Sequence, residues 1–243
     1  MNYLKSILKK RVLNLAMNND IMMPIIISLK VSVISTIITS VLSIFIAWMM
    51  VKSNKKNGSI LEAIITLPLV LPPSILGYIL LIIIGNNGLI GKFFYDNFEW
   101  SIIFTWKACV IASVIVSFPL MYQNCKSSFQ SIDKKILNAA RTMGASERKI
   151  FFRIAIPLAH TGIISGLVLA FARSLGEFGA TMMVAGNIPR KTQTIPLAMY
   201  YAVERGDKVM ANTLMIVVVT FSFLLIYFLN RWIEKRRNRN AEL

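Results

Sequence analysis

Charged side chains are scarce in this sequence. Asp, Glu, Lys and Arg make up 16% of the 243 residues, whereas soluble domains carry about 25%, and 56% of the residues are hydrophobic. This balance excludes an ordinary soluble domain with a large core. It indicates a protein that buries apolar surface in lipid.

Residues that bind metals or form disulfides are also few. The chain has one histidine, scattered carboxylates and two cysteines, Cys109 and Cys125. In one helix these cysteines are separated by about 24 Å along the axis, whereas a disulfide needs Cα atoms within about 7 Å. We therefore expect two free thiols and no metal site.

Motifs for nucleotide chemistry and secretion are missing as well. Because the sequence has no GxxxxGK[ST] phosphate loop, we expect no ATPase activity by that route. We also expect no catalytic residue and no cofactor bound by this chain. The first apolar run exceeds the roughly 7–15 residues of a signal-peptide core. We expect that run to remain in the membrane.

Long apolar runs are what the sequence has instead. A helix crosses the hydrocarbon core with about 20 apolar residues, and five runs qualify, at approximately 24–51, 60–84, 101–122, 158–185 and 210–230. The sequence therefore predicts an all-α, polytopic membrane protein with about five transmembrane helices.

Basic residues are distributed unevenly between these runs. Three fall in 52–56, seven in 126–153 and five in 231–239, whereas the loops 85–100 and 186–209 hold one and four. Basic loops stay in the cytoplasm, so the distribution places the third-to-fourth connection and the C-terminus there. Membrane topology thus explains the net charge of +16 without nucleic acid.

Residues 21–232 are predicted to form one membrane domain. Residues 1–20 place their apolar side chains on one helical face, which predicts an amphipathic helix lying in the membrane interface. Five crossings put this segment outside, although its four basic residues favour the cytoplasm. Residues 233–243 form a basic cytoplasmic tail.

The second apolar run contains Pro68, Pro72 and Pro73. Each proline removes a hydrogen-bond donor, so this helix must kink or break. Broken backbone inside a membrane has to be covered by protein or by a water-filled cavity. Two interpretations stay open, a kink that fits neighbouring helices or a wall of a substrate path that includes Pro72 and Pro73.

Two further features of the runs have open interpretations. Ser32, Ser35 and Thr39 belong to a hydroxyl stripe on one face of the first run, which either packs against a helix or lines a polar passage. Arg173 and Glu177 are ionisable groups inside the fourth run, and their spacing of four lets them pair. The pair is either a structural clamp or a site where Arg173 attracts a passing anion.

Residues 138–159, NAARTMGASERKIFFRIAIPLA, separate the third and fourth runs. A helix over 134–143 would give a surface with little side-chain bulk, and Gly144 suits the left-handed residue after its end. Ser146 can cap a second helix, and Pro157 suits the first turn of the next span. The prediction is a helix–turn–helix knob, which either transmits force or lies on anionic lipid.

This segment resembles the EAA loop of importer-type ABC permeases, E-A-A, three residues, G, nine residues, I, one residue, L-P. Ala139, Ala140, Gly144, Ile154 and Pro157 keep the spacing of that motif. Two positions depart from it, because Asn138 replaces the acidic residue and Ile156 replaces leucine.

The resemblance extends from about residue 22 to residue 230. LPLVLPPSILGY, FARSLGEFGAT and GNIPRKTQTIPLAMY are similar, in that order, to permease subunits of molybdate ABC importers, with sulfate permeases as near neighbours. The resemblance implies a homodimer in the cytoplasmic membrane, two cytoplasmic ABC ATPase subunits that use ATP, and an external oxyanion-binding protein. It makes residues 123–157 a coupling loop that docks on the ATPase.

The expected function is import of molybdate across the cytoplasmic membrane, with sulfate or tungstate as alternative cargo. Two other classes stay open. One is a channel or ion-driven carrier that uses Arg173 and Glu177 without ATP. The other is a membrane anchor whose knob binds lipid.

Overall fold

The computed structural model describes residues 19–53 and 58–241, and every regular element within those ranges is helical. Its longest helices are α2 (Asn19–Lys52), α6 (Trp106–Gln130), α10 (His160–Leu175) and α13 (Lys208–Ala241). The all-α prediction is therefore confirmed. The predicted amphipathic segment 1–20 lies outside the described residues, apart from the last two, which begin α2.

Three helices of the described chain are each long and apolar enough to cross a membrane: α2, α6 and the Lys208–Phe228 part of α13. Two bent helix pairs provide at most two further crossings, one for each pair. The first pair is α3 (Gly58–Val70) with α4 (Pro73–Ile84), and the second joins Glu147–Leu158 to α10. Up to five crossings result, as predicted.

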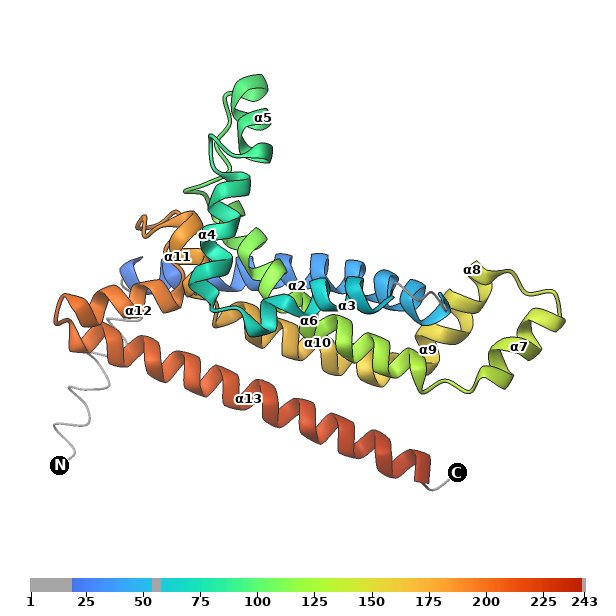
Figure 1. Cartoon of the computed structure of the whole chain (residues 1–243). Coiled ribbons are helices and arrows are strands. Elements are labelled where there is room, and N and C mark those ends of the chain that lie inside the picture. The colour runs from blue at the N-terminus through green and yellow to red at the C-terminus, as the bar shows by residue number, and fades with distance from the viewer. Residues whose placement is uncertain (1–18, 54–57, 242–243) are drawn as a thin grey trace, which may run out of the picture.

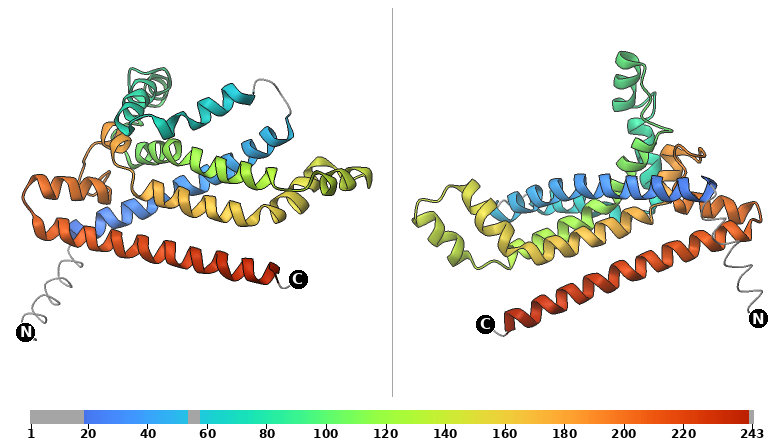
Figure 2. Two further views of the ribbon diagram at one scale, coloured as in Figure 1. Left: turned by 60° about the horizontal axis from the view of Figure 1, so that its bottom comes forward. Right: turned by 180° about the vertical axis from the view of Figure 1, so that it is seen from behind.

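Helices α2, α6 and α10 lie side by side at the centre of the bundle (Figures 1 and 2). Glycines permit the close approach of α10 to α6. A Cβ added at Gly166 would lie 2.8 Å from the sulfur of Met121, and one added at Gly162 would overlap the side chain of Ser128. Small residues at helix crossings are typical of membrane bundles, where packing rather than the hydrophobic effect holds helices together.

The bundle has two distinct ends (Figure 1). The start of α2 and the short helix α12 (Ile195–Glu204) lie at one end. The other end carries α7 (Lys134–Thr142), α8 (Glu147–Ile150) and the last turns of α13. We call residues 133–158 the knob, and this second end the knob end.

The second span is broken rather than gently kinked. α3 and α4 meet at an angle of 116°. Pro72 has extended backbone angles (φ −53°, ψ 137°), and Pro73 starts α4. Proline forces the preceding residue out of the α conformation, so the Pro72–Pro73 pair ends one helix and begins the next.

The fourth predicted span, 158–185, is also two helices. α10 ends at Leu175 and α11 begins at Gly179 and ends at Ala185. The sequence did not predict this break, because residues 176–178 contain one charged residue in an otherwise apolar run. A bend of 73° at Ala159 separates α10 from the knob.

Two predicted boundaries are wrong. The third span begins at Trp106 rather than near 101, because Phe104 has a positive φ of 57° and Thr105 caps the helix. The same helix continues to Gln130, so residues 123–130 belong to α6 rather than to the connecting loop. The loop expected over 85–100 contains α5 (Leu89–Phe98), which projects from the bundle on α4 (Figure 1).

Helices α4 and α11, which follow the two breaks, pack closely against each other. A Cβ added at Gly77 would lie 2.9 Å from Cα of Ala180, and one added at Gly179 would lie 2.8 Å from Cβ of Pro73. The two interrupted spans therefore cover each other's broken backbone, which satisfies the requirement for protein cover at membrane depth.

This packing predicts the effect of enlarging Gly77. Replacing Gly77 with Val should destabilise the protein by ~1–3 kcal/mol, because the added atoms would force α4 away from α11. A lower midpoint of thermal unfolding in detergent would report it. Gly176→Ala is the control, since its added Cβ would meet its nearest neighbour, the carbonyl oxygen of Ala172, at an ordinary contact distance of 3.7 Å. Equal midpoints for the Gly77→Val variant and the unaltered protein would contradict the close packing.

Candidate functional site

Local sequence signals shape the first half of the knob. The Asp133 carboxylate caps α7 by accepting a hydrogen bond from the backbone N–H of Lys135 at 2.8 Å. After α7, Gly144 has a φ of +78°. The N–H of Ala145 donates to the carbonyl of Ala140, and the N–H of Gly144 donates to that of Arg141. This is the Schellman arrangement, so the predicted left-handed role of Gly144 is confirmed.

The second half of the knob departs from the prediction. Ser146 caps α8 as expected, but the helix continues through a π-helical turn, Phe151–Ala155, and α9 (Ile156–Leu158). Pro157 thus lies in α9, before the 73° bend that separates this segment from α10, which starts at His160. In the π-turn the N–H of Ile156 donates to the carbonyl of Phe151.

The predicted ATPase-coupling residues do not form a single exposed surface. Ala139 and Gly144 are exposed, and a Cβ added at Gly144 would meet no atom within 4 Å. Pro157 is exposed as well, and Ile154 is half-buried. Ala140, by contrast, is buried (3% exposed) and belongs to the core of the knob. The surface with little side-chain bulk therefore consists of Ala139 and Gly144. Ala140 lies on the opposite side of α7 and packs this helix against the core.

An apolar cluster anchors the knob to the bundle. Leu137 of α7 and Ile150 of α8 are buried in one cluster with Trp48 of α2 and Phe129 of α6. The rings of Trp48 and Phe129 lie edge to face at 5.4 Å, and Phe151 contacts Trp48 at 5.5 Å. The knob is thus continuous with the core rather than a loose loop.

A polar network links the knob to α2 at the surface. Glu147 pairs with Arg141 of α7, at 2.9 Å from Nε, and with Lys52 at the end of α2, at 3.1 Å from Nζ. Arg141 also donates to the side-chain oxygen of Asn138 at 2.9 Å. Hydrogen bonds from Arg141 and then Lys52 hold the pKa of Glu147 below its ordinary value, and the Glu147 carboxylate raises the pKa of Arg141. Both groups are charged at neutral pH.

Sequence reasoning missed this network. No sequence pattern singled out Glu147, and Lys52 was only one of the three basic residues in 52–56. The six-residue spacing of Arg141 and Glu147 gives no signal within one helix. The turn at Gly144 is what brings them together.

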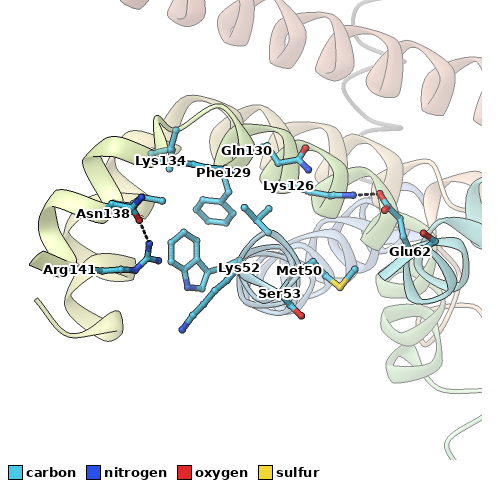
Figure 3. Close-up of a pocket in the computed structure, with 15 residues that line it drawn as sticks. Met50, Lys52, Ser53, Glu62, Lys126, Phe129, Gln130, Lys134, Asn138 and Arg141 are labelled. Atoms are coloured by element: carbon cyan, nitrogen blue, oxygen red, sulfur yellow. Dashed lines mark hydrogen bonds and ion pairs between the residues drawn. The ribbon is translucent and has the colours of Figure 1, made fainter. Parts of the chain in front are cut away.

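A pocket of ≈ 680 Å³ lies at the knob end between α2, α3, α6 and α7 (Figure 3). Trp48, Phe129 and Leu137 are among its lining residues. Asn138 and Arg141 line it on the knob side, and the ion pair of Lys126 with Glu62 lies on the opposite side. The pocket separates the polar side of α7 from the end of α2 and the start of α3.

The hydroxyl stripe of α2 is buried between helices. Ser32, Ser35 and Thr39 are each at most 1% exposed. Ser35 bonds to Ser174 of α10, and Thr39 bonds to Ser117 of α6 at 3.2 Å. Within one chain this geometry favours packing over the lining of an open passage.

Arg173 and Glu177 pair as their spacing predicts, with Nη1 of Arg173 2.8 Å from Oε2 of Glu177. The second carboxylate oxygen accepts a hydrogen bond from the backbone N–H of Ala180 at 2.8 Å. Glu177 is 2% exposed, whereas the side chain of Arg173 is 32% exposed. The pair therefore stabilises the break between α10 and α11, and part of the Arg173 guanidinium stays accessible.

The predicted path residues approach one another at two places in the structure. Pro73, at the break of the second span, touches Gly179, two residues after Glu177 at the break of the fourth span. The stripe of Ser32, Ser35 and Thr39 lies at the contacts of α2 with α6 and α10, and there Ser35 bonds to Ser174, the residue that follows Arg173.

The described residues contain no group of three His, Cys, Asp or Glu side chains that could hold a metal ion. Cys109 and Cys125 are buried and free.

Comparison with known proteins identifies the family. Residues 39–239 match the model of the binding-protein-dependent transport system inner membrane component. The chain is 43% identical over 213 residues to the molybdenum transport system permease protein ModB of Haemophilus influenzae, covering 87% of this chain and 93% of that protein. It is 31% identical to a probable sulfate transport system permease of Chlorokybus atmophyticus, covering 84% and 71%.

The fold is similar to that of a solved transporter. The inward-facing MetNI methionine ABC transporter aligns with a TM-score of 0.69 at 16% identity, over 89% of this chain and 95% of that one. With the helical bundle and the sequence match together, the chain belongs to the inner membrane components of binding-protein-dependent transport systems, and it is a multi-pass membrane protein.

Proposed function

We propose that this chain is the membrane-spanning subunit of an ATP-driven molybdate importer. The observation that carries the proposal is the 43% identity to a molybdenum permease across almost its whole length, against 31% for a sulfate permease. Sulfate and tungstate remain the alternative cargo, and tungstate shares the charge and shape of molybdate.

ATP hydrolysis is assigned to a separate subunit that docks on the knob. The support is the exposed, low-bulk surface at Ala139 and Gly144, beside which a second protein can approach the backbone closely. The knob is also packed from beneath, with Ile150 fully buried in the cluster shared with α2 and α6, so that movement of the knob reaches the bundle. An external binding protein would deliver the oxyanion at the opposite end of the bundle.

The path for the anion is assigned to the interface of two copies of the chain. Two observations support this proposal. The hydroxyl stripe is buried inside the single chain, so it offers no open passage there. In addition, 17% of the apolar segment Lys208–Phe228 is buried, against 61% in α6, which leaves an extensive apolar face for a second copy and lipid.

In this mechanism ATP binding favours one arrangement of the two copies and hydrolysis restores the other. A ligand shifts such an equilibrium by its differential affinity for the two states. Arg173, held by Glu177 beside the broken spans, provides positive potential for an oxyanion. A shallow binding site suits transport, because tight binding would slow release.

Vesicle uptake tests the proposed function. Radiolabelled molybdate should accumulate when the permease, an ATPase subunit, the binding protein and ATP are all present, and should not accumulate with an ATPase subunit disabled in hydrolysis. Excess tungstate should compete, and excess sulfate should compete far less. Uptake that proceeds without ATP would favour a channel or ion-driven carrier instead.

Enlarging Ala139 tests the docking surface. Ala139→Trp should reduce capture of the ATPase subunit by the purified permease at least tenfold, because a large side chain would hold the docked partner away, a loss of ~1.4 kcal/mol or more. Ala139→Ser is the matched control and should capture the ATPase normally, because residue 139 is exposed and serine adds little bulk there. Normal capture by the Trp variant would exclude this surface, as expected for a knob that binds lipid.

A further inference from the structure

The knob is joined to the bundle by two different kinds of contact. The apolar contact lies beneath, where Leu137 and Ile150 share a cluster with Trp48 and Phe129. The polar contact lies at the surface, where Glu147 bridges Arg141 of α7 and Lys52 of α2. Between them, the ≈ 680 Å³ pocket leaves the polar side of α7 without direct packing against the end of α2 (Figure 3).

We propose that Glu147 is a positioning residue that fixes α7 to the end of α2, so that displacement of the knob is transmitted to the first span. This inference rests on the proposed function, because it concerns how force from a docked ATPase reaches the transmembrane helices. Glu147 itself touches neither cargo nor nucleotide in this account.

The position of Glu147 in the turn explains why this residue has that role. It follows the Ser146 cap at the start of α8, while Arg141 lies in the last turn of α7. One carboxylate therefore joins both helices of the knob, and its second oxygen pairs with Lys52. Asn138 adds to the network by accepting from Arg141, which orients the guanidinium towards Glu147.

Helix α2 is a suitable recipient of the motion. It is 34 residues long, so it reaches from the knob end to the opposite end of the bundle (Figure 1). Its buried hydroxyls bond to α6 and α10, and the hydroxyl of Ser28 accepts from the backbone N–H of Ile195 at the start of α12 at 2.7 Å. A shift of its last turn is therefore passed to the elements at the far end.

The network affects orientation more than stability. The side chains of Lys52, Arg141 and Glu147 are 38–48% exposed, and exposed ion pairs contribute about 0–1 kcal/mol. The apolar cluster keeps the knob folded when the network is lost. Removing Glu147 should thus leave a folded knob that is free to tilt over the pocket, so that ATPase movement is transmitted less completely.

The chain offers a matched control for this idea. Glu62 of α3 pairs with Lys126 of α6 on the opposite side of the same pocket, and its side chain is 39% exposed, against 40% for Glu147. Glu62→Gln makes the same chemical change at the same end of the bundle without touching the knob.

The test measures ATP hydrolysed per molybdate imported, in vesicles that contain the permease with its ATPase subunit and binding protein. Glu147→Gln should capture the ATPase normally and raise this ratio about fivefold, the effect of an exposed network worth ~1 kcal/mol. Lys52→Gln should raise the ratio similarly, and the double variant should be no worse than either single variant, since both remove the same link. Glu147→Asp should restore most of the coupling, and Glu62→Gln should leave the ratio unchanged.

An unchanged ratio in Glu147→Gln would overturn the inference, as would an equal rise in Glu62→Gln or additive effects of Lys52→Gln and Glu147→Gln. The midpoint of thermal unfolding checks that each variant folds. If Glu147→Gln does not fold, Lys52→Gln tests the same link from the α2 side. If the unaltered permease captures no ATPase and still imports molybdate, the proposed function fails, and the inference fails with it.

Discussion

The apolar contact between the knob and the helical bundle is the interaction on which the rest of the structure depends. Ile150 and Leu137 are buried against Trp48 and Phe129, so the segment between the third and fourth spans shares a core with α2 and α6. A polar loop lying on lipid would not need such a core. Because the knob is packed from beneath, its outer surface at Ala139 and Gly144 is left free for another protein, and a push on that surface reaches the helices directly.

A second constraint comes from the membrane. Backbone N–H and C=O groups that leave a helix at membrane depth must be satisfied by protein or water. Two spans break there, and each break is covered by the other, with Gly77 and Gly179 at the contact and the Glu177 carboxylate capping the N–H of Ala180. The buried Glu177 carboxylate and its ion pair with Arg173 therefore have a structural role, which is to stabilise the break between α10 and α11. The exposed part of Arg173 leaves room for a role in attracting the anion.

Much of this arrangement is predictable from local sequence signals. Proline chemistry predicted the break at Pro72 and Pro73, the spacing of four predicted the pair of Arg173 and Glu177, and glycine predicted the left-handed turn at Gly144. Each signal acts over a few residues.

What sequence reasoning missed depends on contacts distant in the chain or on backbone geometry. The burial of Ala140, the link from Glu147 to Lys52 and the facing of Gly77 by Met183 are set by tertiary packing. The π-helical turn before Pro157 and the break after Leu175 have no strong residue signature. The hydroxyl stripe remained ambiguous in sequence because small hydroxyl residues suit both packing and passage.

The central claim is that an ATPase subunit docks on the surface at Ala139 and Gly144. Site-specific photo-crosslinking from residue 139, in membranes that contain the permease and its ATPase subunit, tests it most directly. The account predicts a crosslink to the ATPase from residue 139 and none from the exposed residue 191 at the opposite end. Crosslinks from residue 139 to lipid alone, in membranes that still import molybdate with ATP, would contradict it.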